Sequence, residues 1–140
     1  IEKVRVFEGV TYINDSKGTN VDSTIKAVQS MKAPTVILLG GYDKHTDFMP
    51  LCREMITSGM IAHAVVMGET SRQIREQLEE AGYTAITQAY SMQDAVDKAR
   101  RLAVPGGNVL LSPACASFDM FQDYEQRGRV FKEIVNGLHE

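Results

Sequence analysis

Residues 110–135 read LLSPACASFDMFQDYEQRGRVFKEIV, and this stretch passes from a buried strand through a run of small residues to a charged amphipathic helix. The apolar start is typical of a strand covered on both faces. From about Asp119, apolar residues recur at helical spacing, so we expect a helix there with Ser117 as its N-cap. A strand, a tight loop and a helix form the repeating unit of a parallel α/β sheet.

The same alternation is present along the rest of the chain. Short apolar runs predict strands at residues 35–41, 62–68, 83–89 and 107–112, and helical spacing predicts helices at 20–31, 48–59, 70–82 and 91–103. The segment VRVFEGVTYIN (4–14) indicates a hairpin with its turn at Glu8 and Gly9. We therefore expect an α/β fold: a doubly wound, mostly parallel, Rossmann-like sheet with helices on both faces and an N-terminal hairpin.

The composition limits the size and the partners of the protein. A chain of 140 residues, 44% of them hydrophobic, suits a single core, so we treat residues 1–140 as one domain. The formal net charge of −3 gives no bulk attraction to nucleic acid. Without a long apolar run or a signal-peptide layout, we expect no membrane partner and a cytoplasmic location. Cys52 and Cys115 have no neighbours at metal-ligand spacing, which predicts no metal site.

Small and polar residues follow three of the predicted strands. They occur in YINDSKGTN (12–20), LLGGYDKHTD (38–47) and LLSPACASFD (110–119). In an open parallel sheet, ligands bind outside the carboxyl ends of the strands, and small residues allow the backbone to approach a polar ligand closely. We therefore expect the three segments to form one crevice.

Each of these segments also has a purely structural interpretation. Asp15, Ser16, Thr19 and Asn20 are residue types that make turn and N-cap hydrogen bonds. The sequence GGYDK lacks the spacing of a phosphate-binding P-loop and is typical of a tight turn. Cys115 is typical of a small buried thiol, because no partner histidine is apparent. The residues alone leave these alternatives open.

Three motifs, in this order and at these separations, resemble the C-terminal domain of the Mur ligases of peptidoglycan synthesis. They are YINDSKGTNVDST (12–24), LLGGYDK (38–44) and the stretch 110–135 quoted above. The likeness covers the whole chain. Other Mur ligases and the folylpolyglutamate synthases typically carry an Asp-Tyr-x-His or Asp-Gly-x-His-Asn type of sequence at the first motif, where this chain has NDSKGTN (14–20). The difference favours the member that adds D-glutamate.

The resemblance implies an enzyme of three domains, of which residues 1–140 are the last. One of the other domains holds the UDP-sugar, and a central P-loop domain holds ATP and Mg²⁺; no GxxxxGK[ST] sequence occurs in this chain. In the implied reaction, ATP converts the L-alanyl carboxylate of UDP-N-acetylmuramoyl-L-alanine to an acyl phosphate, which the amine of D-glutamate attacks. We expect a monomeric full-length enzyme, and no catalysis by the isolated domain.

The resemblance also assigns a D-glutamate site. Thr19 and Lys44 match positions that bind the carboxylate nearer the amine, while Ser117 and the backbone of Tyr124 match the site of the side-chain carboxylate. The small residues before Ser117 would let the final helix start close to this anion. Tyr124 departs from the phenylalanine that is common among relatives, and its phenol needs a hydrogen-bond partner if it is buried.

Two further residues match positions that face the nucleotide. Lys17 would approach the phosphates and Asp15 the ribose.

Two other functions stay open on the sequence. The first is a Mur ligase or folylpolyglutamate synthase relative that adds a different amino acid. The second is a stand-alone flavodoxin-like binding module, in which GGYDK and SPACAS (112–117) would be structural turns. A P-loop encoded upstream of this chain would favour the ligase.

Overall fold

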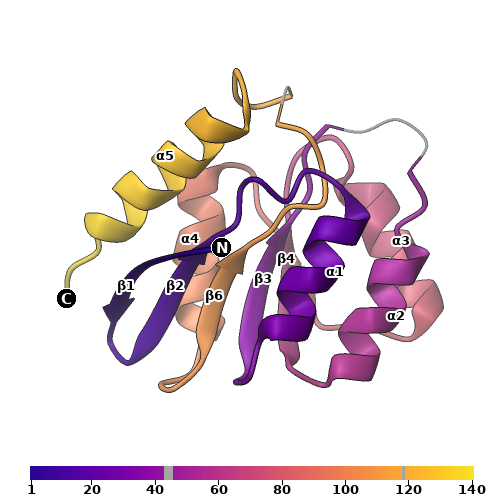
Figure 1. Cartoon of the computed structure of the whole chain (residues 1–140), viewed down its shortest axis with the longest axis horizontal. Coiled ribbons are helices and arrows are strands. Elements are labelled where there is room, and N and C mark those ends of the chain that lie inside the picture. The colour runs from indigo at the N-terminus through magenta and orange to yellow at the C-terminus, as the bar shows by residue number, and fades with distance from the viewer. Residues whose placement is uncertain (43–45, 118) are drawn as a thin grey trace.

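The computed structural model describes residues 1–42, 46–117 and 119–140. This part of the chain forms a six-stranded sheet with helices packed on both faces (Figure 1). The strands are β1 (Glu2–Phe7), β2 (Val10–Asn14), β3 (Thr35–Leu39), β4 (Ile61–Val66), β5 (Ile86–Gln88) and β6 (Asn108–Leu111). The helices are α1 (Val21–Ser30), α2 (Met49–Ser58), α3 (Ser71–Ala81), α4 (Met92–Leu102) and α5 (Tyr124–Asn136).

The strand order is β1-β2-β6-β3-β4-β5. Strand β1 pairs antiparallel with β2, and the remaining pairings are parallel. Strand β6 lies between β2 and β3, with Leu111 in register with Asn14 on one side and with Leu38 on the other. The carboxyl ends of β2, β6 and β3 are therefore adjacent, and the predicted doubly wound, mostly parallel sheet is confirmed.

The predicted N-terminal hairpin is also confirmed. Phe7 pairs with Val10, and the turn residues Glu8 and Gly9 have φ angles of 53° and 79°. Two-residue hairpin turns of type I′ require positive φ at both central residues, which glycine accepts at little cost.

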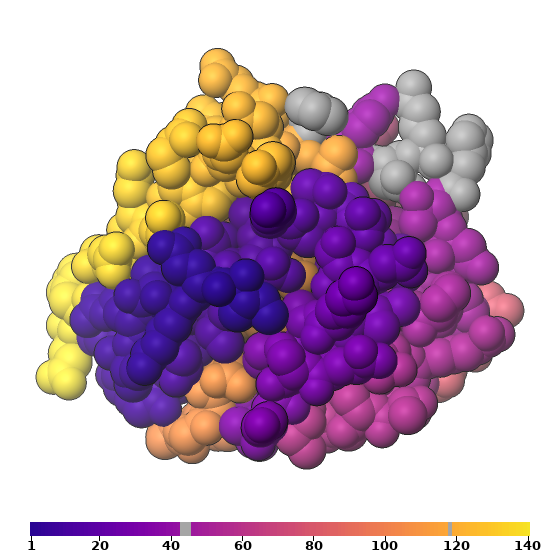
Figure 2. All heavy atoms as spheres, viewed as in Figure 1, coloured from indigo at the N-terminus to yellow at the C-terminus, as the bar shows by residue number. Residues whose placement is uncertain are grey.

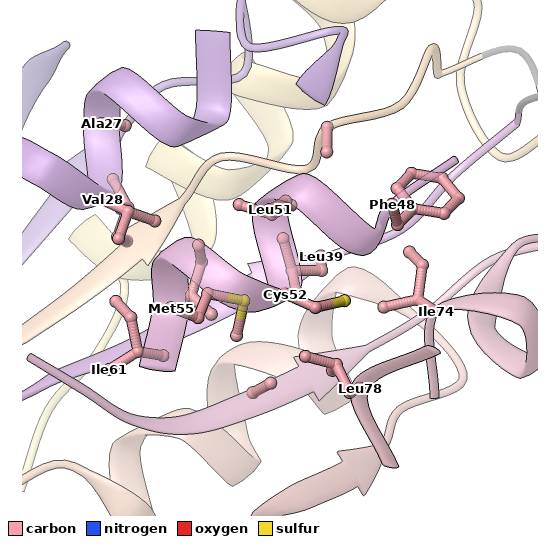
Figure 3. Packing of buried hydrophobic residues seen from close by; sticks show 14 of the residues in the cluster. Ala27, Val28, Leu39, Phe48, Leu51, Cys52, Met55, Ile61, Ile74 and Leu78 are labelled. Carbon is pink, nitrogen blue, oxygen red and sulfur yellow. The ribbon is translucent and has the colours of Figure 1, made fainter. Parts of the chain in front are cut away.

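Strand residues alternate between two hydrophobic clusters, one on each face of the sheet. In β3, Ile37 and Leu39 pack with α1, α2 and α3, whereas Val36 and Leu38 pack with α4 and α5. Figure 3 shows the first cluster, in which Cys52 of α2 lies among aliphatic side chains. Burial on both faces explains why these strands read as continuous apolar runs rather than as alternating ones.

The final helix begins later than the sequence predicted. Its N-cap is Asp123, whose carboxylate accepts a hydrogen bond from the backbone N–H of Gln126 at 2.7 Å. Ser117 instead closes a short turn, in which its carbonyl oxygen accepts from Met120 at 3.1 Å and from Phe121 at 2.8 Å. The expectation of a helix from about Asp119 with Ser117 as its N-cap was therefore wrong.

The weak strand predicted at 83–89 is shorter than expected. Only Ile86–Gln88 pair with β4, because the Tyr83 N–H is used to close α3 by donating to the Leu78 carbonyl oxygen. In the part of the chain that the structure describes, no helix is both long enough and apolar enough to cross a bilayer.

Candidate functional site

Three loops meet at the carboxyl ends of β2, β3 and β6. We call them the first loop (residues 15–20), the second loop (residues 40–48) and the third loop (residues 112–123). The Ala114 N–H donates to the Gly18 carbonyl oxygen at 2.9 Å and so joins the third loop to the first. The Tyr42 N–H donates to the Ala116 carbonyl oxygen at 2.8 Å and joins the second loop to the third. The structure thus brings together the three segments expected to form one crevice.

The first loop is held from below by a small polar network. The Ser112 hydroxyl donates to Asp15 Oδ2 at 2.8 Å, and Thr24 Oγ1 lies 3.0 Å from the Ser112 hydroxyl and donates to its carbonyl oxygen at 3.2 Å. One oxygen of the Asp15 carboxylate, Oδ2, is therefore engaged in this network. Asn20 caps α1 by accepting from the Ser23 N–H at 2.9 Å, so the structural interpretation is confirmed for Asn20.

Lys17 and Thr19 lie on the outer side of the same loop. The Thr19 N–H donates to the Lys17 carbonyl oxygen at 2.8 Å, which makes a tight turn between them. Lys17 is exposed and Thr19 is half-buried. Both side chains can therefore reach a ligand above the carboxyl end of β2.

The second loop starts as the tight turn that the sequence indicated. A Cβ on Gly41 would lie 2.3 Å from the carbonyl oxygen of Ala116, so only glycine allows the two loops to pair. The Gly41 N–H donates to Thr70 Oγ1 at 3.1 Å, which ties the turn to the start of α3. Lys44, assigned above to D-glutamate, lies outside the described residues.

The third loop is buried where it meets the second. Cys115 is fully buried with its Sγ 3.4 Å from Thr70 Oγ1, which confirms the buried-thiol interpretation. Ser117 is also buried, at 2% exposure. We had expected the final helix to start directly after these small residues, but α5 begins at Tyr124. Their size instead allows the backbone at Ala116 to pair with the second loop.

Tyr124, the first residue of α5, has one backbone group already engaged. Its carbonyl oxygen accepts a hydrogen bond from the Ser16 hydroxyl at 2.7 Å, while its side chain is 37% exposed. The phenol therefore reaches water and does not need a buried partner.

A groove of about 360 Å³ lies between the first loop and α5. Figure 2 shows the face on which α5, in yellow, lies beside the N-terminal segment, in indigo. Asp15, Lys17 and Tyr124 line the groove together with Arg129 and Lys132 of α5. Three of the six residues assigned from the sequence therefore share one groove, whose walls carry both cations and the carboxylates of Glu2, Asp15 and Glu125.

Arg127 is a residue that the sequence reasoning missed. Its guanidinium is buried at 1% exposure, with Nε donating to Ser16 Oγ at 2.8 Å, Nη2 to the Ser16 carbonyl oxygen at 2.7 Å and Nη1 to the Cys115 carbonyl oxygen at 2.9 Å. Burial lowers the pKa of Arg127 to about 10, so it stays charged at neutral pH. One signal was available, because the i, i+4, i+8 spacing places Arg127 on the buried face with Phe131 and Val135.

The fold and the loops define a doubly wound α/β domain with its candidate site at the carboxyl edge of the sheet, where ligands bind in open parallel sheets. The sequence of residues 1–115 matches the family described as "Mur ligase, glutamate ligase domain", and the chain belongs to this family.

Curated relatives resemble the chain over nearly all of its length. It is 46% identical over 138 residues to the UDP-N-acetylmuramoylalanine–D-glutamate ligase of Pelotomaculum thermopropionicum and 44% identical over 138 residues to that of Caldicellulosiruptor saccharolyticus. It is 42% identical over 137 residues to the enzyme of Alkaliphilus oremlandii. These alignments cover 98–99% of this chain but 30% of each relative. The chain thus spans about 30% of the length of these relatives.

A solved structure has the same fold. It is a domain from Haemophilus ducreyi, described as part of a UDP-N-acetylmuramate:L-alanyl-γ-D-glutamyl-meso-diaminopimelate ligase, and it superposes with a TM-score of 0.53. The match covers 95% of this chain and 98% of the other, at 14% identity. At this identity the likeness supports the fold alone.

Proposed function

We propose that residues 1–140 form the C-terminal domain of a cytoplasmic, monomeric ligase that adds D-glutamate to UDP-N-acetylmuramoyl-L-alanine with consumption of ATP. The observation that carries the proposal is the 42–46% identity, along nearly the whole chain, to proteins named for this activity. The UDP-sugar site and the P-loop belong to parts of the protein outside this chain.

In this proposal, D-glutamate binds above all three loops. Its two carboxylates need cationic and hydroxyl partners, because burying an unpaired anion is costly. Thr19 and Lys44 take the carboxylate nearer the amine. Ser117 is assigned the other, and because it is buried at 2% exposure, the third loop must shift to expose its hydroxyl. The carbonyl oxygen of Tyr124 is already bonded to Ser16, so the N–H is the backbone group of Tyr124 that suits a carboxylate.

The groove between the first loop and α5 suits the polyphosphate side of ATP. Lys17 projects from one wall, and Arg129 and Lys132 project from the other. Lys132 lies 3.3 Å from Glu2, so part of its charge is already balanced. The other oxygen of the Asp15 carboxylate, Oδ1, lies 3.6 Å from the N-terminal amine of Ile1, so a ribose hydroxyl would share it with that amine.

Among the described residues there is no group of three or more His, Cys, Asp or Glu side chains that could hold a metal ion. In this proposal Mg²⁺ binds mainly in the central domain outside this chain.

The contribution of this domain to the reaction is positioning. The acyl phosphate is already activated, so the amine needs to be held in line with it and unprotonated, and the carboxylates need to be neutralised. Fixed hydroxyl and N–H groups on short loops do this with little reorganisation.

The test uses the full-length protein that carries this chain. Supplied with ATP, Mg²⁺ and UDP-N-acetylmuramoyl-L-alanine, it should release phosphate with D-glutamate and not with meso-diaminopimelate or L-lysine. Release with another amino acid alone would reject the proposal. The isolated chain should neither hydrolyse ATP nor form the amide. Magnesium-dependent ATP turnover by it would contradict the assignment of the ATP site to a part of the protein outside this chain.

A matched pair of variants tests the site itself. Thr19→Ala removes a hydroxyl from the proposed D-glutamate site, and Thr11→Ala removes one from the same strand-and-loop segment at the other end of β2. Loss of one hydrogen bond to a charged group, at about 1.5 kcal/mol, should lower kcat/KM for D-glutamate about tenfold in Thr19→Ala. Thr11→Ala should leave it unchanged, and equal effects would remove Thr19 from the site.

A further inference from the structure

Arg127 is buried with no carboxylate within ion-pair distance among the described residues, and the nearby charge of Asp119 only partly offsets the lowering of its pKa by burial. Its three hydrogen bonds go to neutral oxygens, two on Ser16 of the first loop and one on Cys115 of the third. The described ion pairs do not include it. Burying a charge in this way is costly, and a helix needs no such group for packing, since Phe131 and Val135 already fill the same face.

The guanidinium lies at the junction of all three loops. Besides its bonds to the first and third loops, its Nη1 lies within 3.4 Å of where a Cβ on Gly41 of the second loop would be. The planar fork of arginine can hold acceptors on two separate loops at fixed angles, which the point charge of lysine cannot do.

Ser16 passes this restraint on to its neighbours. Its hydroxyl accepts from Arg127 and donates to the Tyr124 carbonyl oxygen, and its N–H donates to Asn14 Oδ1 at 3.0 Å. The two neighbours of Ser16 in the sequence, Asp15 and Lys17, are the residues assigned to the nucleotide. The relative placement of the nucleotide side and the D-glutamate side of the site therefore depends on one buried side chain.

We propose that Arg127 is a positioning residue, whose guanidinium fixes the first loop to the third loop in the arrangement that the two substrate sites require. Arg127 does not touch substrate, so it acts through Ser16 and Cys115. The kinetic part of the test rests on the function proposed above, whereas the exchange part does not.

The variant Arg127→Lys keeps the charge and removes the fork. A control is Leu78→Ala, which creates a cavity in α3 without removing any hydrogen bond of Arg127, in the cluster on the opposite face of the sheet from Phe131 and Val135 of α5. Hydrogen–deuterium exchange by mass spectrometry on the full-length protein should show about tenfold faster exchange at residues 112–117 in Arg127→Lys, because the first loop, whose Gly18 carbonyl oxygen accepts from the Ala114 N–H, is no longer held to the third loop. In Leu78→Ala the faster exchange should fall on residues 71–81.

Equal exchange at 112–117 in wild type and Arg127→Lys, or an equal increase in both variants, overturns the proposal. If Arg127→Lys does not fold, Ser16→Ala removes one acceptor of the fork and should give the same pattern at smaller amplitude. Unchanged exchange at 112–117 in Ser16→Ala then overturns it.

Steady-state kinetics separate positioning from support of the fold. Displaced loops should raise KM for D-glutamate about tenfold or more in Arg127→Lys. Mere loss of folded protein would lower kcat at unchanged KM, as in Leu78→Ala, and that result overturns the proposal. A wild-type protein that does not use D-glutamate would reject the proposed function and leave the exchange experiment to decide on Arg127.

Discussion

The two ends of the sheet use glycine for different reasons. At the amino end, Gly59, Gly82 and Gly106 have φ angles of 68°, 97° and 89°, and a Cβ on any of them would meet nothing within 4 Å. At the carboxyl end, Gly40 has a φ of 112°, and a Cβ there would lie 1.9 Å from the carbonyl oxygen of Met67. Backbone conformation alone favours glycine at these three positions, whereas close packing also requires it at Gly40. Gly107 is an exception at the amino end, because a Cβ there would lie 2.4 Å from the carbonyl oxygen of Pro34.

The largest effect is expected from Gly40→Ala. The new methyl group would overlap backbone atoms that cannot move aside, so the free energy of unfolding should fall by more than about 4 kcal/mol. Gly59→Ala, with open space, should cost about 1–2 kcal/mol for the left-handed backbone alone. Urea denaturation of the 140-residue chain measures both. Similar losses in the two variants would contradict the difference between the ends.

A second effect at the carboxyl end is expected from Arg127→Met. Methionine fills much of the space but leaves the two carbonyl oxygens and the Ser16 hydroxyl without their donor, which should cost roughly 3 kcal/mol of unfolding free energy. At the amino end, Asn108→Ala removes a side-chain bond to Thr35 Oγ1 of 3.2 Å and should cost about 1 kcal/mol. A larger loss of unfolding free energy in Asn108→Ala than in Arg127→Met would contradict the expectation that the carboxyl end is the more sensitive.

The third prediction concerns ligand binding at the second loop. Lys44 follows Gly41 closely in the sequence, and the family resemblance assigns it to a substrate carboxylate. Lys44→Ala should remove a charge-assisted bond of about 1.5–3 kcal/mol and lower kcat/KM for D-glutamate about ten- to several-hundred-fold. Kinetics with D-glutamate and ATP varied separately should show little change in KM for ATP. Unchanged D-glutamate kinetics would remove Lys44 from the site.

The smallest effect is a pH dependence that arises away from the loops. Burial lowers the pKa of His63 in β4 below its ordinary value of 6.5, and its ring nitrogen lies 2.6 Å from Thr87 Oγ1. The unfolded chain therefore binds more protons, and stability is full above about pH 6.5 and falls as the pH drops below it.

His63→Gln should remove this pH-dependent loss of stability, which is small because the ring is only partly buried. Arg127, with its pKa of about 10, stays charged over this range and should add nothing. Urea midpoints measured between pH 5 and 8 check this, and an unaltered profile in His63→Gln would contradict it.

The strands and most helices could be predicted because their signals are local. Helical spacing and a cap residue, Asn20, predicted α1. A glycine between two strand-like runs predicted the hairpin, and Gly9 has the positive φ that its turn requires. The start of α5 was misplaced because Ser117 and Asp123 are both good N-caps, and the choice between them is made by packing of the third loop.

The sequence predicted which loops form the site, but not which side chains contact one another within it. Polar and charged residues on accessible loops, such as Lys17 and Thr19, could be found from the sequence. For Arg127 the helical spacing indicated only a position on the buried face, and its hydrogen-bond partners Ser16 and Cys115 could not be predicted, because an arginine on an amphipathic helix is normally solvated. Which polar groups satisfy one another depends on tertiary structure that no local pattern encodes.

The position of β6 also sets the order in which the chain can fold. Its neighbours β2 and β3 are synthesised before helices α2 to α4, and the strand that pairs with both of them follows those helices. Until then, two strands in the middle of the future sheet have open edges that can pair with other chains. Such long-range pairing slows folding, so the nascent chain should depend on chaperones or fast synthesis more than a protein with local contacts does.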